Sequence, residues 1–111
     1  MAEVSKETEE KISQLQLLEQ NLQSFVAQKQ QFQMQLVEIE SALKELEGSK
    51  ESYRIVANIM VKADKGELKK GLESKKESAS LRIKNLEKHE NLLEEKAKKL
   101  QKEIMEKMKE D

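Results

Sequence analysis

The sequence contains no cysteine, no proline and no tryptophan, and it has only three glycines. The absence of cysteine excludes disulfides and thiolate chemistry, and the absence of proline leaves long helices unbroken. Aromatic residues make up 3% of the chain, and no apolar run approaches the ~20 residues that a membrane span requires. The first residues, MAEVSKETEEK, are too polar for a signal peptide. We therefore expect a cytoplasmic protein without membrane attachment.

Charged side chains, by contrast, are abundant. The 111 residues include 21 basic and 22 acidic side chains, which together make up 39% of the chain and nearly cancel. A typical globular domain is about 25% charged, and an excess of this kind is typical of long helices and coiled coils. The length allows one domain over residues 1–111. The balanced charge and the lack of stacking aromatics give no reason to expect nucleic-acid binding.

A heptad repeat predicts a first helix over residues 5–47. Nine of the ten a and d positions between 15 and 46 are apolar, and the exception is Lys29. Such a stripe, here called the seam, keeps facing a partner helix because it repeats every 3.5 residues. Ser5 is placed to cap the start, and Gly48 to end the helix in a left-handed conformation. The apolar seam positions are Leu15, Leu18, Leu22, Phe25, Phe32, Leu36, Ile39, Leu43 and Leu46.

A second heptad repeat predicts another helix over residues 65–108. Asp64 and Glu67 have the spacing of a capping box at its start. Three charged residues, Lys69, Lys76 and Glu90, interrupt one of its two apolar series. The apolar seam positions of this helix are Leu72, Ala79, Ile83, Leu86, Leu93, Ala97, Leu100 and Ile104.

The segment over residues 48–64, GSKESYRIVANIMVKAD, loses the heptad and predicts a linker and a β-hairpin. The runs YRIV and IMVK flank Ala57-Asn58, which favours a two-residue turn. The type of turn stays open because alanine adopts positive φ poorly. Such a hairpin pairs Val56 with Ile59 and returns the second helix antiparallel to the first. The same register places Leu15 opposite Leu100.

Lys29 and Glu90 fall in adjacent seam layers under this register. Both side chains can reach past a narrow two-helix interface to solvent. Alternatively they pair and fix the register, as a buried polar residue can. In that case we expect Lys29→Leu to increase stability while loosening the alignment of the helices.

The hairpin has largely apolar side chains on both faces. A lone two-stranded hairpin is marginal in water and has two open edges. It can pack on its own helix ends, which covers one face only, or join hairpins of other chains in a shared sheet or barrel. The second alternative accounts for both faces and predicts an obligate oligomer. The apolar hairpin residues are Tyr53, Ile55, Val56, Ile59, Met60 and Val61.

Near both termini the seam decays, because Thr8, Lys11 and Lys107 occupy seam positions. Three apolar residues nearby, Ile12, Met105 and Met108, step off the stripe. They are either incidental side chains of a frayed end or an adaptable binding surface, for which methionine is suited. The antiparallel register brings these residues together. The terminal cluster, as we name it, consists of Val4, Ile12, Leu15, Leu100, Ile104, Met105 and Met108.

We find no constellation typical of an enzyme. His89 is the single histidine, and a zinc site would need partners that the sequence does not supply. The three glycines are scattered and form no phosphate-binding loop. We expect no catalysis, no metal and no cofactor.

The chain resembles prefoldin subunits of the beta type, archaeal ones in particular. The resemblance lies in the Gln-rich stretch LQLLEQNLQSFVAQKQQFQMQL, the hairpin YRIVANIMVKADK and the stretch ESKKESASLRIKNLEKHENLLEEK. One hairpin between two long helices distinguishes the beta type from the alpha type, which has two. The resemblance implies a mainly α fold: a long antiparallel two-helix coiled coil joined by one β-hairpin that assembles into an intersubunit β-barrel.

The resemblance also implies a function. Prefoldin assembles two alpha-type and four beta-type subunits into a hexamer, and it is an ATP-independent chaperone (a holdase). It binds unfolded or nascent proteins at its coiled-coil tips and transfers them to a group II chaperonin. On this reading the apolar hairpin residues build the barrel and the terminal cluster holds clients. The alternative is a structural coiled-coil adaptor that binds one folded partner.

Overall fold

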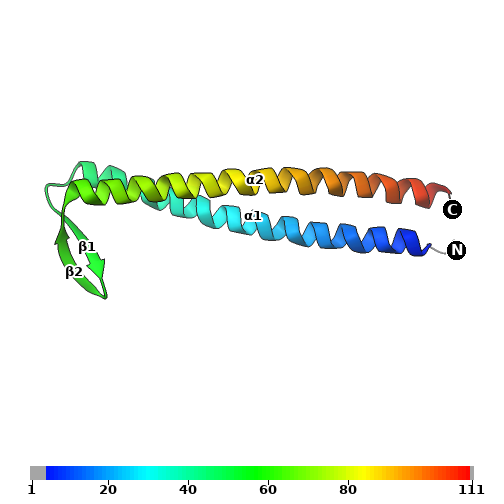
Figure 1. Ribbon diagram of the computed structural model, residues 1–111, viewed down its shortest axis with the longest axis horizontal. Coiled ribbons are helices and arrows are strands. Elements are labelled where there is room, and N and C mark those ends of the chain that lie inside the picture. The colour runs from blue at the N-terminus through cyan, green and yellow to red at the C-terminus, as the bar shows by residue number, and fades with distance from the viewer. Residues whose placement is uncertain (1–4, 111) are drawn as a thin grey trace. The chain divides into compact units, whose positions relative to one another are not determined.

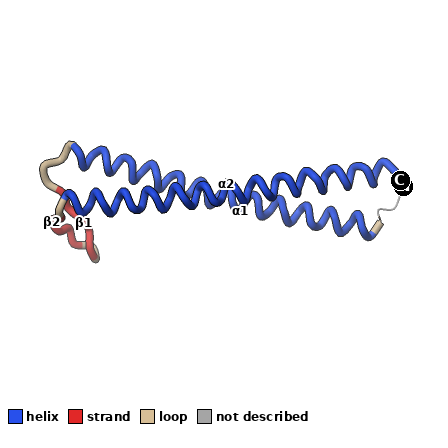
Figure 2. The backbone as a smooth tube through the Cα atoms, turned by 45° about the horizontal axis from the view of Figure 1, so that its top comes forward, coloured by secondary structure: helices blue, strands red, loops and turns tan. Residues whose placement is uncertain are grey.

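The computed structural model of the protein describes residues 5–110. Two helices flank a two-stranded sheet, in the order α1 (Lys6–Glu47), β1 (Ser52–Val56), β2 (Ile59–Ala63) and α2 (Lys65–Glu110) (Figure 1). Figure 2 separates the helical and strand segments by colour. The prediction of a mainly α chain with one hairpin between two long helices is confirmed.

Contacts divide the chain into two units. One contains Met1–Lys29 and Asn85–Asp111 and is called the terminal unit, and the other contains Gln30–Lys84 and is called the hairpin unit. Each unit includes a part of α1 and an antiparallel part of α2.

Both helices begin at the predicted caps. The amide of Thr8 donates to Ser5 Oγ over 3.2 Å at the start of α1, and the amide of Glu67 donates to Asp64 Oδ2 over 3.1 Å at the start of α2. Each cap satisfies one of the amides that the first turn of a helix leaves without an intrahelical partner.

The prediction for the end of α1 is wrong in one respect. Gly48 follows the helix directly but has no positive φ. Ser49 satisfies helix carbonyls instead: its hydroxyl donates to the Glu45 carbonyl over 3.0 Å and its amide donates to the Leu46 carbonyl over 3.3 Å. With those acceptors satisfied from the side chain and backbone of Ser49, the left-handed glycine is not needed.

In the terminal unit, apolar seam residues of α2 are buried more completely than those of α1. Leu86, Ala97 and Ile104 of α2 are at most 9% exposed, whereas the seam leucines of α1 are half-buried. A two-helix interface has no third neighbour to cover its side chains, so most seam residues stay partly exposed. An ion pair of 3.4 Å joins Lys11 of α1 to Glu103 of α2, in agreement with the predicted register.

In the hairpin unit, the helices pair in the same sense. Ala79 of α2 is buried at 5% exposure, and the Arg82 guanidinium lies 5.3 Å from the Phe32 ring centre. One predicted seam position is wrong, because Lys69 is exposed and Leu68 is half-buried in its place. At the first turn of α2 the apolar side chain takes the inward position, which leaves the ammonium group in water.

The hairpin has the predicted register. Val56 pairs with Ile59 and Ile55 with Met60 in an antiparallel ladder. Ala57 has a φ of 47° and Asn58 a φ of 67°. Two consecutive positive φ values define the type I′ turn, which matches the twist of the strands. The turn type that the sequence left open is therefore type I′. Ala57 adopts a conformation that glycine and asparagine adopt more readily than alanine.

Candidate functional site

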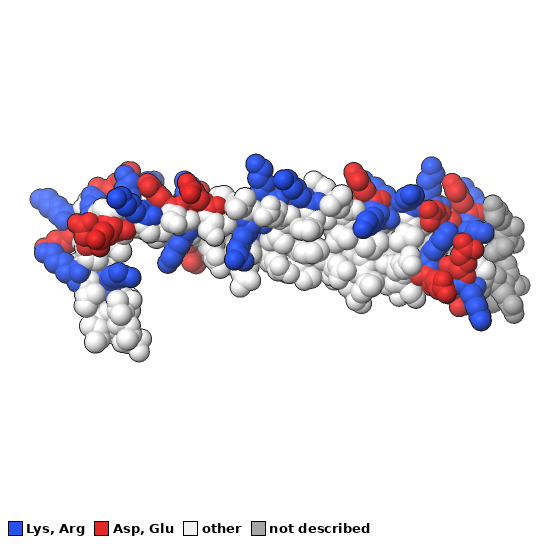
Figure 3. Space-filling model, in the orientation of Figure 1, with Lys and Arg blue, Asp and Glu red and all other residues white. Residues whose placement is uncertain are grey.

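The apolar hairpin residues all lie exposed. Ile55, Met60 and Ile59 retain 71%, 66% and 64% of their accessible surface, and Tyr53, Val56 and Val61 are also exposed. In the view of Figure 3 the outer part of the hairpin is free of charged side chains. The hairpin therefore does not pack on the helix ends of its own unit, and that alternative is wrong.

The edges of the hairpin are available as well. The sheet of the described chain consists of β1 and β2 only, so each strand pairs along one side. The outward-facing amides and carbonyls of an unpaired strand are a template for another strand. Added strands gain main-chain hydrogen bonds from the edge and specificity from side-chain pockets. Exposed apolar side chains beside open edges form a surface fit for strand-to-strand association.

The base of the hairpin is held by short polar contacts. Ser52 is buried at 8% exposure, and its hydroxyl donates to the Ala63 carbonyl over 2.7 Å. Next to it, the Tyr53 hydroxyl donates to Glu51 Oε2 over 2.6 Å. This hydrogen bond to the carboxylate favours the protonated phenol and, with a smaller effect of desolvation, raises the pKa of Tyr53 above 10.0.

The terminal cluster combines exposed and buried side chains. Met105 and Met108 are 61% and 53% exposed, whereas Ile104 is 8% exposed within the seam. Ile12, Leu15 and Leu100 are half-buried. Val4 lies outside the described residues. Among the described residues of this cluster, the two methionines are the exposed ones.

A polar layer interrupts the terminal unit beside its boundary. Lys29 Nζ donates to Glu90 Oε2 over 3.0 Å, with the Glu90 side chain 10% exposed. Among the described residues, Glu90 Oε1 is a buried oxygen without a hydrogen-bond partner. The two residues therefore pair, and Glu90 does not reach solvent. The neighbouring His89 is exposed and stacks on Phe25 with ring centres 5.6 Å apart.

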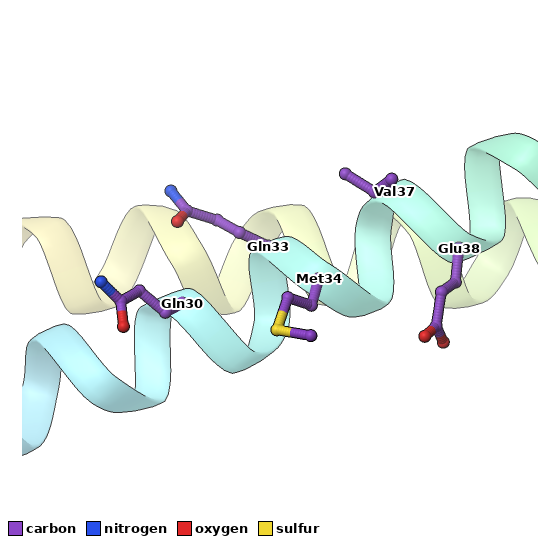
Figure 4. A pocket seen from close by; sticks show the side chains of 5 residues that line it. All are labelled: Gln30, Gln33, Met34, Val37 and Glu38. Atoms are coloured by element: carbon purple, nitrogen blue, oxygen red, sulfur yellow. The ribbon is translucent and has the colours of Figure 1, made fainter.

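The sequence reasoning missed one apolar surface on α1. A shallow groove in the hairpin unit is lined by Gln30, Gln33, Met34, Val37 and Glu38 (Figure 4). Met34 and Val37 are 67% and 62% exposed. Their signal in the sequence was the scarcity of charge in the Gln-rich stretch, in which neutral amides replace the lysines and glutamates that cover most of α2.

The described residues hold no group of three or more His, Cys, Asp or Glu side chains suited to a metal ion. Neither α1 nor α2, over the part that the structure describes, has an apolar stretch long enough to cross a bilayer.

Comparison with known proteins assigns the chain to a family. Residues 9–111 match the family model described as "Prefoldin subunit". The prefoldin subunit beta of Archaeoglobus fulgidus is 37% identical over 98 residues, which cover 86% of this chain and 84% of that protein. The prefoldin subunit beta of Thermococcus onnurineus is 34% identical over 107 residues, with 94% and 92% covered.

A solved structure gives the same assignment. The crystal structure of the prefoldin beta subunit from Thermococcus strain KS-1 matches with a TM-score of 0.89 and 32% identity, and the match covers 96% of each chain. Prefoldin subunits form a non-enzymatic family with chaperone function, and this assignment does not favour the structural adaptor. The chain described here belongs to the prefoldin family, as a subunit of the beta type.

Proposed function

We propose that the apolar hairpin residues join this chain to alpha-type prefoldin subunits and to further copies of itself in a hexamer of two alpha and four beta chains. The observation that carries the proposal is the exposure of all six apolar hairpin residues beside two open edges. A hairpin of this size cannot cover its own apolar side chains. Hairpins of several chains, joined edge to edge in a barrel, bury those side chains and pair the edges.

The terminal cluster is the surface that holds unfolded or nascent client proteins in the cytoplasm before their transfer to a group II chaperonin. Met105 and Met108 support this assignment because they are exposed and because methionine adapts to differently shaped apolar partners. Binding of this kind gains about 25 cal/mol per Å² of apolar surface buried. It requires no nucleotide hydrolysis, since capture and release follow from affinity alone.

Native mass spectrometry tests the assembly. The chain is measured alone and mixed with an alpha-type prefoldin subunit. A mixed hexamer with two alpha and four beta chains supports the proposal. A mixture in which the two proteins remain separate contradicts it.

An aggregation assay with several unrelated denatured proteins tests client binding. Deletion of residues 1–10 and 102–111 should abolish suppression of aggregation and leave the hexamer intact. The double substitution Met105→Ser and Met108→Ser should weaken suppression for every client. Leu92→Ser is the matched control, since Leu92 is an exposed apolar residue of the same helix and unit. Loss of the oligomer on truncation would show that assembly and client binding do not reside in different units.

A further inference from the structure

The C-terminal end of α1 has an unusual cap. The last carbonyls of a helix lack intrahelical donors, and Ser49 satisfies those of Glu45 and Leu46. Two further carbonyls follow, that of Glu47 at the end of α1 and that of Ser49 in the linker. Lys65 Nζ donates to both, over 3.1 Å and 3.0 Å. Lys65 thus completes the cap that Ser49 begins, where a left-handed glycine was expected.

The position of Lys65 in the chain gives this cap a second consequence. Lys65 is the first residue of α2, so it follows the hairpin, whereas both of its acceptors precede the hairpin. The contact therefore links the segment that enters the hairpin to the segment that leaves it. Its positive charge also lies at the negative end of the α1 dipole, where a cation is stabilising.

The segment between α1 and β1 has no regular structure of its own. Residues 48–51 form a turn and a bend that connect helix to strand. The hydroxyl of Ser52 fastens β1 to the end of β2 through the Ala63 carbonyl, but this bond holds the strands to each other and not to the helix. Among the polar contacts described at the hairpin base, the two from Lys65 are those that link α2 to the end of α1 and to the linker.

We propose that Lys65 is a positioning residue, which sets the direction in which the hairpin leaves the helices and so controls assembly through the hairpin. The inference rests on the proposed role of the hairpin in assembly. Hairpins that pair edge to edge must meet in one geometry. A hairpin on a loose linker loses conformational freedom when it associates, and this ordering weakens binding. The Lys65 contacts impose that order before the chains meet.

Assembly measurements test the proposal with two substitutions of Lys65. Lys65→Met keeps most of the aliphatic stem and removes the donors, and Lys65→Arg keeps a cationic donor. The protein concentration at half-assembly with an alpha-type subunit should rise about tenfold in Lys65→Met, which corresponds to the loss of about 1.4 kcal/mol, and return toward the wild-type value in Lys65→Arg. Lys69→Met is the control, because Lys69 is exposed one turn further along α2.

Distance measurements give a readout that a loss of helix stability would not produce. The chain has no native cysteine, so spin labels attach only at Lys62→Cys and Ser74→Cys, two exposed positions in the hairpin unit. The distance distribution of the unassembled chain should be narrow in the wild type, broad with Lys65→Met and narrow again with Lys65→Arg, while the helical circular dichroism stays unchanged. Equal widths and equal assembly midpoints in the wild type and Lys65→Met would overturn the inference.

The positioning role of Lys65 can be wrong while the proposed function of the hairpin is correct. If Ile55→Asp abolishes assembly and Lys65→Met leaves the midpoint unchanged, the hairpin remains the assembly surface and the positioning role is wrong. If Ile55→Asp has no effect on assembly, the proposed function of the hairpin itself is wrong.

Discussion

The terminal unit and the hairpin differ in where their apolar side chains are covered. In the terminal unit, the α2 residues Leu86, Ala97 and Ile104 are buried against α1 of the same chain. In the hairpin, every one of the six apolar residues remains exposed. The paired helices cover their apolar side chains within one chain, because their two apolar faces meet. The two-stranded hairpin has a face on either side and no second layer, and under the proposed function other chains bury it.

This difference separates two kinds of substitution. A change in the hairpin should alter association with little effect on the fold of the single chain. A change in the seam should alter the fold, because that interface is internal.

The largest effect is expected from a charge in the hairpin. Ile55→Asp places a carboxylate in the surface that association would bury, and the assembly constant should fall a hundredfold or more, about 3 kcal/mol or above. Helical circular dichroism of the single chain should not change, because Ile55 is 71% exposed. Sedimentation velocity with an alpha-type subunit measures the assembly. Lys62→Ser, also on the hairpin, is the control, and loss of helicity in Ile55→Asp would contradict the separation.

A cavity in the seam should instead lower the free energy of unfolding of the single chain. Leu86→Ala removes buried methyl groups, and the free energy of unfolding should fall by about 2–3 kcal/mol, toward the lower end for buried leucines because a two-helix interface relaxes readily. Leu92→Ala is the matched control at 56% exposure, with an expected change within about 0.5 kcal/mol. Urea unfolding of the single chain compares them. Equal effects of the two substitutions would show that the seam is not the stabilising interface.

Substitutions of Lys29 and Glu90 test how the seam tolerates a charge without its partner. Lys29→Leu removes the cation from a carboxylate that is 10% exposed and already has one unpartnered oxygen, so unfolding free energy should fall by about 1–3 kcal/mol. The sequence alone predicted a gain in stability, since it did not reveal how deeply Glu90 is buried. The double substitution with Glu90→Leu should restore or exceed the wild-type value.

The same double variant examines the register. Cysteine pairs placed across the helices of the terminal unit should cross-link at more than one alignment if the Lys29–Glu90 pair fixes the register. Cross-linking confined to the original alignment would remove that role and leave the pair a contribution to stability only.

Relief of the strained turn should give a smaller, favourable effect. Ala57 has a φ of 47°, and an L-residue in this region costs roughly 1–2 kcal/mol, part of which Gly offsets through its greater freedom when unfolded. Ala57→Gly should therefore stabilise the hairpin and lower the assembly midpoint by a few fold. Asn58→Ala, which removes a residue tolerant of positive φ, should act in the opposite direction. A higher midpoint for Ala57→Gly would contradict the strain argument.

Periodicity predicted the helices, the hairpin and their register because each depends on residue spacing. The Val56–Ile59 pairing and the caps at Ser5 and Asp64 follow from local rules. The end of α1 could be predicted only in part. Ser49, which satisfies two of its carbonyls, is close in sequence, but the Glu47 carbonyl accepts from Lys65, which lies beyond the hairpin. For the candidate site, the spacing identified the apolar hairpin residues, but their exposure required the structure. In the terminal cluster the heptad already separated Ile104, a seam position that is buried, from Met105, which lies off the seam and is exposed.

The smallest effect concerns the ionisation of Tyr53 at the base of the hairpin. The Tyr53 hydroxyl donates to Glu51 Oε2, and the pKa of Tyr53 is raised above 10.0. A raised pKa means that the folded hairpin prefers the protonated phenol. The resulting stability is therefore fully present below the pKa of the unfolded chain and is lost as the pH rises through the pKa of the folded chain.

The composition makes this titration straightforward to measure, because the chain has one tyrosine and no tryptophan. Ultraviolet absorbance of the phenolate should therefore report Tyr53 alone. Glu51→Gln should shift the midpoint back toward 10.0, since a neutral amide accepts the hydroxyl proton less strongly than a carboxylate does. Glu47→Gln, at the end of α1, is the control and should leave the midpoint in place. Identical midpoints in the wild type and Glu51→Gln would show that the hydrogen bond does not hold the phenol proton in solution. The Tyr53–Glu51 contact would then not order the base of the hairpin.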